Sequence, residues 1–302
     1  MAEGKFLQCA ALLMGCYLLG CASSLASRQL VDELGRHATL PDEPQRIVCL
    51  SPSLAETVYA LGLGSLVVGV TEFTDYPPEA RTKPSVGSLD NPSVEKIISL
   101  HPDLVLAMGT INREETVDDL ERVGIPVYVV DPQGLPGIEK SIQDVGVALN
   151  RPADAARLLQ RLEAERLAVA ARVKGLPRPK VLVVIWYDPV VTAGGKSFIN
   201  GLISAAGGQS VTADMKQAWP QISLEEVIRR SPDYLLLVRG AHEGMTAKEL
   251  KAHAGWDQLP ALRNNRVLYV DERFIHPSPV AFDALRQLAR ELHPGAFQNQ
   301  ER

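Results

Sequence analysis

The stretch Arg151 to Lys174 reads RPADAARLLQRLEAERLAVAARVK and is the longest uninterrupted helical pattern in the chain. Pro152 suits the first turn of a helix, Gly175 suits the position just after one, and Pro177 prevents continuation. Apolar residues keep to one stripe, whereas charged residues occupy the other faces. At 1.5 Å per residue such a helix is about 35 Å long, roughly the width of a small domain. The stretch therefore predicts a strut in mid-chain that joins two halves.

Strand-like and helix-like segments alternate on both sides of this stretch. Apolar strand patterns occupy 46–50, 66–70, 103–108, 126–130, 181–186, 234–238 and 267–270. Such alternation with helical segments predicts mainly parallel sheets covered by helices on both faces. The sequence therefore predicts an α/β fold of two Rossmann-like lobes joined by one long α-helix: an N-terminal lobe at 46–150, the connecting helix at 151–175 and a C-terminal lobe at 176–302.

An internal repeat supports two equivalent lobes. The segment at 93–104, SVEKIISLHPDL, aligns with the segment at 223–234, SLEEVIRRSPDY, at a constant offset of 130. Each opens on a serine that suits a helix N-cap and carries a glutamate, Glu95 or Glu225, in the first turn. Two matched acids on a two-lobed surface suit a partner with two-fold symmetry. Compensation of the helix dipole is the simpler alternative.

The first residues are typical of an export signal. Lys5 precedes an almost uncharged run at 6–20, too short to span a bilayer comfortably. The sequence Leu-Leu-Gly-Cys that ends at Cys21 matches the pattern before a lipidated cysteine in bacterial lipoproteins. Residues 1–20 are therefore interpreted as a signal peptide, and Cys21 as a lipidated N-terminus that holds the protein at a membrane.

Other interpretations of this region stay open. A second lipoprotein pattern ends at Cys16, plain cleavage near Ala22 or Ala26 would leave no lipid, and the apolar run could be a buried helix. Residues 21–45 are polar and rich in proline toward their end, which predicts a tether. Only Cys49 then remains, and its apolar surroundings predict a buried thiol without a disulfide partner.

Composition narrows the function. The 302 residues are 46% hydrophobic and 22% charged, an ordinary globular composition with room for two cores. A net charge of −5 without a long basic run argues against nucleic acid as a partner. Six scattered histidines show no HxxxH or HExxH spacing, so no metal site is expected.

Motifs of catalysis and nucleotide binding are incomplete. Gly195-Lys196-Ser197 resembles the end of a phosphate-binding loop, but the position five residues before Gly195 is Val190 rather than glycine. No GxSxG elbow occurs. The sequence thus gives no support for catalytic residues or a bound cofactor.

Candidate ligand-binding residues follow the predicted strands. In open α/β sheets, sites lie beyond the carboxyl ends of the strands. Aromatic residues are only 5% of the chain, yet they gather with polar residues at these places, which favours a ligand cleft. Packing between the lobes is the alternative explanation. The candidates are Ser51, Ser53, Phe73, Tyr76, Trp186, Tyr187, Trp219, Arg273 and Phe274.

Four motifs together resemble a known family. They are RIVCLSPSLAE at 46–56, DYPP at 75–78, VEKI leading to PDL at 94–104, and WPQIS at 219–223. They are similar to substrate-binding proteins of bacterial ABC importers, and more narrowly to the vitamin B12-binding type within the group that also binds iron-siderophores and haem. The resemblance covers residues 46 to about 292.

The resemblance implies two lobes joined by one rigid helix, with a ligand held in the cleft between them. It implies that Glu95 and Glu225 dock onto arginines of a dimeric permease, and that four aromatic residues line the cleft: Phe73, Tyr76, Trp186 and Trp219. The expected function is a lipid-anchored extracytoplasmic protein that delivers a corrinoid, vitamin B12, to an ABC importer.

Two positions depart from the pattern. Pro279 is followed by Val280 where the family often has Pro-Arg, and Met108-Gly109-Thr110 stands where the B12 binder carries aromatic residues. A haem or ferric-siderophore binder of the same architecture is therefore the alternative. A surface enzyme acting on a cofactor fragment is a rival of another class, but the chain shows no nucleophile and base arrangement for it.

Overall fold

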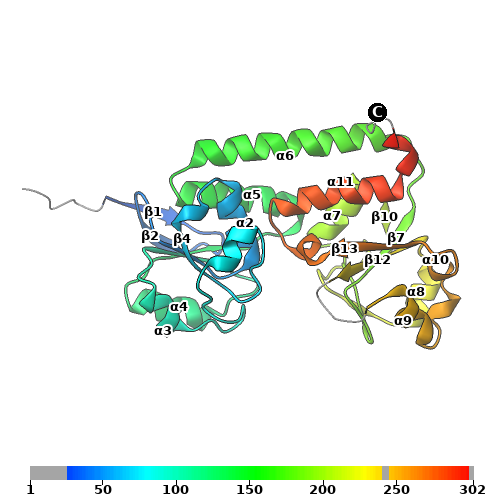
Figure 1. The fold of residues 1–302 in the computed structure, drawn as a ribbon, viewed down its shortest axis with the longest axis horizontal. Helices are drawn as coiled ribbons and strands as arrows, with labels where there is room; N and C mark the ends of the chain where they lie inside the picture. The colour runs from blue at the N-terminus through cyan, green and yellow to red at the C-terminus, as the bar shows by residue number, and fades with distance from the viewer. Residues whose placement is uncertain (1–25, 240–244, 299–302) are drawn as a thin grey trace, which may run out of the picture.

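The computed structural model describes residues 26–239 and 245–298 (Figure 1). The expected signal peptide and Cys21 lie outside these residues. The chain forms two lobes side by side, and helix α6 (Pro152–Val173) runs along both of them, as the sequence predicts. Its predicted stripe of Leu158, Leu162, Val169 and Val173 is buried. Within the described residues, no helix combines the length and apolarity that a membrane crossing requires.

The N-terminal lobe is built on a parallel four-stranded sheet in the order β4-β3-β5-β6. Short runs of buried apolar residues make these strands, as expected for a sheet covered on both faces. Its strands are β3 (Ile47–Cys49), β4 (Val67–Val70), β5 (Leu104–Met108) and β6 (Val127–Val130). Its helices are α2 (Pro52–Ala60), α3 (Val94–Ser99), α4 (Glu114–Arg122) and α5 (Gly134–Ala148), with 3-10 turns η1 (Gly64–Leu66) and η2 (Pro78–Thr82). Cys49 is a buried free thiol, as predicted.

The C-terminal lobe repeats this arrangement in a parallel sheet of order β10-β7-β12-β13. Its strands are β7 (Lys180–Val184), β10 (Gln209–Ser210), β12 (Tyr234–Arg239) and β13 (Val267–Asp271). Its helices are α7 (Phe198–Ala205), α8 (Leu224–Arg230), α9 (Ala247–Ala252), α10 (Pro260–Arg263) and α11 (Val280–Leu292), with 3-10 turns η3 (Trp256–Gln258), η4 (Glu272–Ile275) and η5 (Pro294–Ala296). In each lobe the strands follow the order second, first, third, fourth along the chain, so the two sheets are topologically equivalent.

A small antiparallel sheet in the C-terminal lobe was not predicted from the sequence. It has the order β11-β9-β8 and consists of β8 (Trp186–Tyr187), β9 (Val190–Val191) and β11 (Gln221–Ile222). The sequence pattern extended the first strand of this lobe to Trp186, whereas the parallel strand ends at Val184.

The 130-residue repeat is visible in the backbone. His101 and Ser231, which are 130 residues apart, both adopt φ of 48° just beyond α3 and α8. Asp103 accepts a hydrogen bond from the backbone N–H of Arg46, and Asp233 accepts one from that of Lys180. In both lobes the repeated aspartate thus fixes the start of the first strand.

The segment predicted as a tether is folded from Ser27 onward, so that part of the prediction is wrong. Strands β1 (Ser27–Val31) and β2 (His37–Pro41) form an antiparallel hairpin. Arg28 donates to the carbonyls of Val147 and Ala148 at 2.9 and 3.0 Å. Leu40 is fully buried, because alternate residues of β2 point into the lobe.

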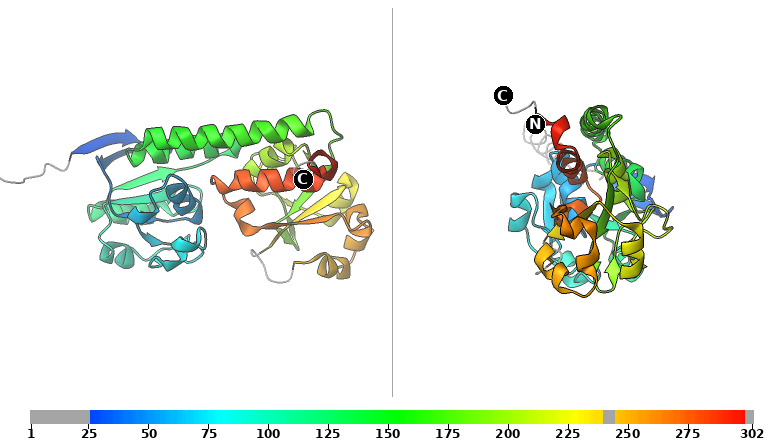
Figure 2. Two further views of the ribbon diagram at one scale, coloured as in Figure 1. Left: turned by 45° about the horizontal axis from the view of Figure 1, so that its top comes forward. Right: turned by 90° about the vertical axis from the view of Figure 1, so that its right-hand side faces the viewer.

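The two lobes are joined by a shared hydrophobic core as well as by the chain connection through α6. Buried residues of α5, α6, α7 and α11 belong to a single cluster that extends from one lobe to the other. Helices α5 and α7 approach so closely that a Cβ on Gly201 would lie 2.8 Å from the Cβ of Leu135. Figure 2 shows α6 and α11 running side by side on one side of the molecule. The junction is therefore a packed layer of helices rather than a single strut.

Candidate ligand-binding site

The carboxyl ends of the two parallel sheets meet across the junction between the lobes. Tyr76 lies in the loop after β4, and Arg273 lies in η4 just after β13. The guanidinium carbon of Arg273 is 4.6 Å from the centroid of the Tyr76 ring, a distance typical of a cation–π contact. Asp271 orients this guanidinium by accepting from its Nε at 2.7 Å. The structure thus brings together two residues that the sequence predicted for the cleft.

The N-terminal wall presents Phe73 on a tight turn. The Thr74 N–H donates to the Thr71 carbonyl at 3.1 Å, and the two threonine hydroxyls lie 3.2 Å apart. Glu72 N–H donates to the Gly87 carbonyl, which holds the turn on the neighbouring loop. Phe73 at the tip of this turn is 59% exposed. Such exposure is unusual for the large apolar side chain of a phenylalanine.

The C-terminal wall carries Trp186 and Trp219 on the small antiparallel sheet. Val191 on β9 pairs with Trp186 on one side and with Gln221 on the other. Trp219 precedes Gln221 by two residues, so both indoles lie at the same end of this sheet. The Trp186 indole N–H donates to the Asp188 carbonyl at 2.8 Å, and Trp219 is 45% exposed. Two large aromatic surfaces therefore lie at the carboxyl end of β7.

Three other predicted residues are placed elsewhere. Ser51 is fully buried, and its hydroxyl caps α2 by accepting from the Leu54 N–H at 3.3 Å. Phe274 is buried in the shared core. Tyr187 packs its ring 4.5 Å from that of His253, in a depression beside the start of α8. None of the three joins Tyr76 and Arg273 in this structure.

Ser53 and Glu56 stand three residues apart at the start of α2, the spacing of a capping box, but they do not form one. Ser51 rather than Ser53 is the N-cap of α2, so Ser53 lies within the buried first turn. Glu56 is 2% exposed and accepts from the Ser278 hydroxyl at 2.5 Å, while His276 Nδ1 lies 2.8 Å from its other oxygen. Glu56 therefore links the N-terminal lobe to the loop that enters α11, a contact over 220 residues that local spacing does not reveal.

Asn112 lies at the place in the N-terminal sheet where the strand order reverses, between β3 and β5. Its amide donates to the carbonyls of Leu50 and Leu89 at 3.0 and 2.7 Å, and its oxygen accepts from the Met108 N–H at 2.7 Å. These bonds tie the ends of β3 and β5 together. Ligands of open α/β sheets generally bind at such reversal points.

Leu34, at the tip of the β1–β2 hairpin, is a further candidate ligand-binding residue that the sequence did not indicate. A Cβ on Gly109 would lie 3.1 and 3.3 Å from the two Leu34 methyl carbons, so the leucine covers the strand end where aromatic residues are absent. Glu33 holds the tip in place by accepting from the Asp131 N–H at 2.6 Å and from the Ser141 hydroxyl at 2.9 Å. Leu34 remains 52% exposed. No sequence motif marks Leu34 as a binding residue, because its segment was predicted to be a tether.

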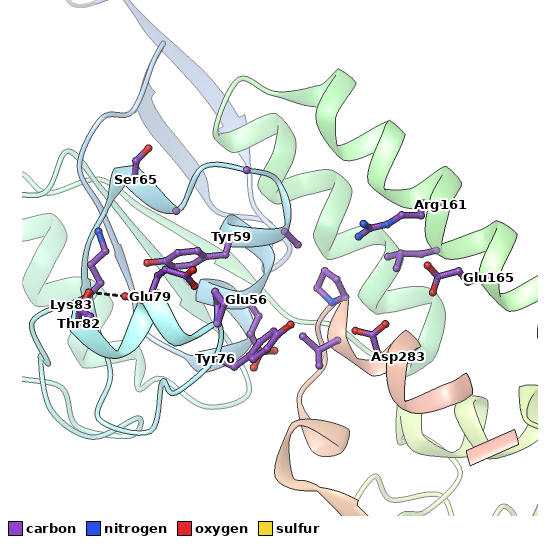
Figure 3. Close-up of a pocket in the computed structure, with 17 residues that line it drawn as sticks. Glu56, Tyr59, Ser65, Tyr76, Glu79, Thr82, Lys83, Arg161, Glu165 and Asp283 are labelled. Carbon is purple, nitrogen blue, oxygen red and sulfur yellow. Dashed lines mark hydrogen bonds between the residues drawn. The ribbon is translucent and has the colours of Figure 1, made fainter. Parts of the chain in front are cut away.

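A cavity of about 820 Å³ lies on the α6 side of the cleft (Figure 3). Glu56, Tyr59 and Tyr76 wall it from the N-terminal lobe, and Arg161 and Asp283 wall it from α6 and α11. The Tyr59 hydroxyl, which is buried there, has no hydrogen-bond partner in the part of the chain that the structure describes. Burial raises the pKa of Tyr59. Among the described residues, no three His, Cys, Asp or Glu side chains gather to hold a metal ion.

The repeated acids occupy equivalent environments. Ser93 and Ser223 cap α3 and α8, as predicted, by accepting from the N–H groups of Lys96 and Glu226 at 3.2 Å. Hydrogen bonds from their own backbone N–H groups and from these serines lower the pKa values of Glu95 and Glu225. Both acids are exposed, and α3 and α8 lie on the side of the lobes remote from α6 (Figure 1).

Comparisons with known proteins agree with this geometry. Residues 47–274 match the family described as periplasmic binding protein. The chain is 30% identical to a vitamin B12-binding protein of Vibrio parahaemolyticus over 84% of its length and 92% of the relative. It is 31% identical to an uncharacterized ABC transporter substrate-binding lipoprotein of Bacillus subtilis, over 88% of this chain and 85% of that one.

A solved structure shows the same architecture. The apo periplasmic heme-binding protein of Roseiflexus sp. RS-1 superposes with a TM-score of 0.76 at 30% identity, covering 83% of this chain and 99% of the other. The family consists of binding proteins for transport and is not an enzyme class. The chain therefore belongs to the periplasmic binding protein family, whose members bind small molecules and deliver them to ABC transporters.

Proposed function

We propose that this protein binds a corrinoid, vitamin B12 or a close relative, and delivers it to an ABC importer. The observation that carries the proposal is the set of large aromatic side chains at the carboxyl ends of both sheets, Phe73, Tyr76, Trp186 and Trp219. A corrin ring has wide apolar faces and an edge of amide side chains. Aromatic walls with a few polar groups suit such a ligand.

The name of the Vibrio parahaemolyticus relative supports the same ligand class, since that protein is a vitamin B12-binding protein. In this chain, Arg273 supplies the polar group at the cleft. Its guanidinium is held by Asp271 and stacked on Tyr76, which leaves N–H donors for ligand amide or phosphate oxygens. Leu34 adds apolar surface at the end of β5.

Glu95 and Glu225 are proposed to dock the protein on a dimeric permease. They occupy matched positions in two equivalent lobes, which suits a partner with two equivalent cationic sites. Within the described residues neither acid forms an ion pair, whereas the adjacent Glu226 pairs with Arg229 and Arg230. An exposed carboxylate without an internal partner remains available to an external cation.

Attachment to the membrane is proposed through lipid on Cys21. The sequence before Cys21 supports it, and the Bacillus subtilis relative is named a lipoprotein. Residues 22–26 would then separate the lipid from strand β1, so the binding lobes would lie close to the membrane surface. The protein would act on the extracytoplasmic side.

Haem is the second candidate, favoured by the pair of Tyr76 and Arg273. A phenol oxygen is a known axial ligand of haem iron, and Arg273 supplies a cation beside the Tyr76 ring for an acidic ligand group. The heme-binding relative of known structure has the same identity to this chain, 30%, as the vitamin B12-binding relative. An electronic spectrum would distinguish a phenolate-bound ferric haem from a bound corrinoid.

A competition experiment tests the proposal directly. The protein is mixed with equal amounts of cyanocobalamin and hemin, separated from free ligand by gel filtration, and its visible absorption spectrum is recorded. The corrinoid spectrum is expected in the protein fraction. A haem spectrum there would replace the corrinoid proposal with its alternative, and an unliganded protein would contradict both.

A further inference from the structure

A buried contact joins the two lobes at the cleft. Glu56 projects from α2 of the N-terminal lobe, and both of its carboxylate oxygens are used by the C-terminal lobe. One lies 2.8 Å from His276 Nδ1, and the other accepts from the Ser278 hydroxyl at 2.5 Å. Side-chain exposure is 1% for Glu56 and 14% for His276. Water is thus nearly excluded from this ion pair.

The contact also organises the start of α11. Ser278 Oγ accepts from the Val280 N–H at 3.2 Å while it donates to Glu56. The carboxylate is therefore connected to the first turn of α11, where the helix dipole favours negative charge. Because α11 packs on α6 and α7, displacement of Glu56 would shift the packing of the helix layer that joins the lobes.

Arg273 depends on the same loop. It lies three residues before His276 in the turn that leads to Ser278, and the His276 N–H donates to its carbonyl at 3.1 Å. The position of its guanidinium over Tyr76 requires the N-terminal loop and this turn to keep their separation. We propose that Glu56 is a positioning residue of the binding cleft: together with His276 and Ser278 it fixes the angle between the lobes and so holds Arg273 against Tyr76.

This inference goes beyond the proposed function, because it can be tested without any ligand. Burying a carboxylate that lacks its partners is costly, so each partner matters. The charged groups that face His276 are mostly acidic: Glu56 on α2, Glu272 and Arg273 on η4, Asp271 at the end of β13 and Asp75 in the loop after β4. The negative charge of these four acids favours the imidazolium.

The sign of the pH dependence follows from these neighbours. Burial by itself lowers the pKa of His276, but the hydrogen bond and charge of Glu56, with Glu272 and Asp75, outweigh it and raise the pKa above the ordinary value. The ion pair therefore stabilises the folded state fully below about pH 6.5 and loses this contribution as the pH rises through the folded-state pKa of His276.

The test measures the distance between the lobes. Spin labels are placed on Lys96→Cys in α3 and Lys248→Cys in α9, two exposed positions on different lobes. Cys9, Cys16 and Cys21 are replaced by serine, and Cys49 is buried, so only the introduced thiols react. Pulsed electron paramagnetic resonance then gives the distance distribution of the ligand-free protein. A single narrow distribution is expected at about pH 6.

Two substitutions break the contact to different extents. Glu56→Gln removes the charge at nearly constant volume, and Ser278→Ala removes one donor. Both should broaden the distribution at about pH 6 or shift it. The unsubstituted protein is expected to show a broader distribution as the pH rises through the pKa of His276, whereas the distribution of Glu56→Gln should not change with pH in this range. If both variants keep the narrow distribution, the inference is overturned.

Glu33→Gln is the matched control. Glu33 is also a largely buried carboxylate with 6% side-chain exposure, and burial raises its pKa, but its partners Lys140, Ser141 and Asp131 all lie in the N-terminal lobe. This variant should unfold more easily yet keep the narrow distribution. An equal broadening for Glu33→Gln would show that general destabilisation is responsible, which would also overturn the inference.

Discussion

Two exposed aromatic side chains, Phe73 and Trp219, stand on the two walls of the cleft, one on each lobe. Exposure of such large apolar surface is unfavourable in the empty protein, at about 25 cal/mol per Å². A ligand with broad apolar faces recovers this free energy on binding. Arg273 and Tyr76, which touch across the cleft, are proposed to hold the polar part of the ligand.

At this scale, Trp219→Ala is expected to weaken corrinoid binding about tenfold, which corresponds to about 1.4 kcal/mol. The reason is loss of aromatic contact area without loss of any core contact. Isothermal titration calorimetry measures the affinity. Leu167→Ala, on an exposed position of α6, is the control and should bind as the unsubstituted protein does. Equal affinity for both variants would remove Trp219 from the site.

Charge reversal of the repeated acids tests the docking surface. Glu95→Lys with Glu225→Lys is expected to leave ligand affinity unchanged and to abolish uptake in vesicles that contain the permease. Each lysine would repel the cations that the acids are proposed to meet. Glu291→Lys on α11, an exposed acid on another face, should transport normally. Normal uptake by the double variant would leave the two acids as helix-dipole partners only.

At the scale of elements, the β1–β2 hairpin changes the view of the N-terminus. Arg28 donates a hydrogen bond to a backbone carbonyl of α5, and Glu33 accepts one from the backbone N–H just after β6. The hairpin also buries Leu40. A segment fixed in this way cannot act as a flexible tether along its whole length. It places its tip, with Leu34, beside the end of β5.

The hairpin supplies a matched pair of leucines. Leu40→Ala is expected to lower the free energy of unfolding by about 2–5 kcal/mol, because it leaves a cavity in the core. Leu34→Ala, in the same hairpin but half exposed, should change it by less than about 0.5 kcal/mol. Urea denaturation followed by circular dichroism gives both values. A small effect of Leu40→Ala would mean that the hairpin is only loosely attached.

Elements with a strong local signal were predictable. The strands around Val48, Leu106 and Leu236 are short runs of buried apolar residues, and α6 has a clear stripe between a proline and a glycine. The partners of Glu56 could not be predicted, because they lie more than 200 residues away along the chain and no local pattern reveals them. Strands β1 and β2 were missed because alternate residues are only half-buried in β1 and only two are buried in β2, so each five-residue segment resembles a polar linker.

The same limit applied to the candidate site. Aromatic residues after strands indicate candidate walls on both lobes, but the sequence does not show which side chains are buried. Phe274 and Ser51 follow strands just as Phe73 does, yet the core covers both of them. Contacts between the lobes, such as that of Arg273 with Tyr76, depend on how the two lobes pack.

At the scale of the whole molecule, the shared helix layer is expected to make the lobes unfold together. All three tryptophans of the chain, Trp186, Trp219 and Trp256, belong to the C-terminal lobe, so fluorescence reports on that lobe alone. Far-ultraviolet circular dichroism reports on both lobes. Coincident urea transitions by the two methods are expected, since one core extends across the junction. Separate midpoints would show that the lobes are independent.

We expect a cleft between lobes that are held by this layer to open little on its own. Ligand release would then depend on forces applied from outside, for which Glu95 and Glu225, on the side remote from α6, are well placed. Ligand release would thus involve the binding cleft, the helix layer and the proposed docking surface together.

The proposed function requires that the cleft binds a corrinoid. Titration of the purified protein with cyanocobalamin by isothermal titration calorimetry tests it most directly. The account predicts a saturable signal with one ligand bound per chain at micromolar or lower ligand concentration. The absence of saturable heat from a folded protein at micromolar cyanocobalamin would contradict it.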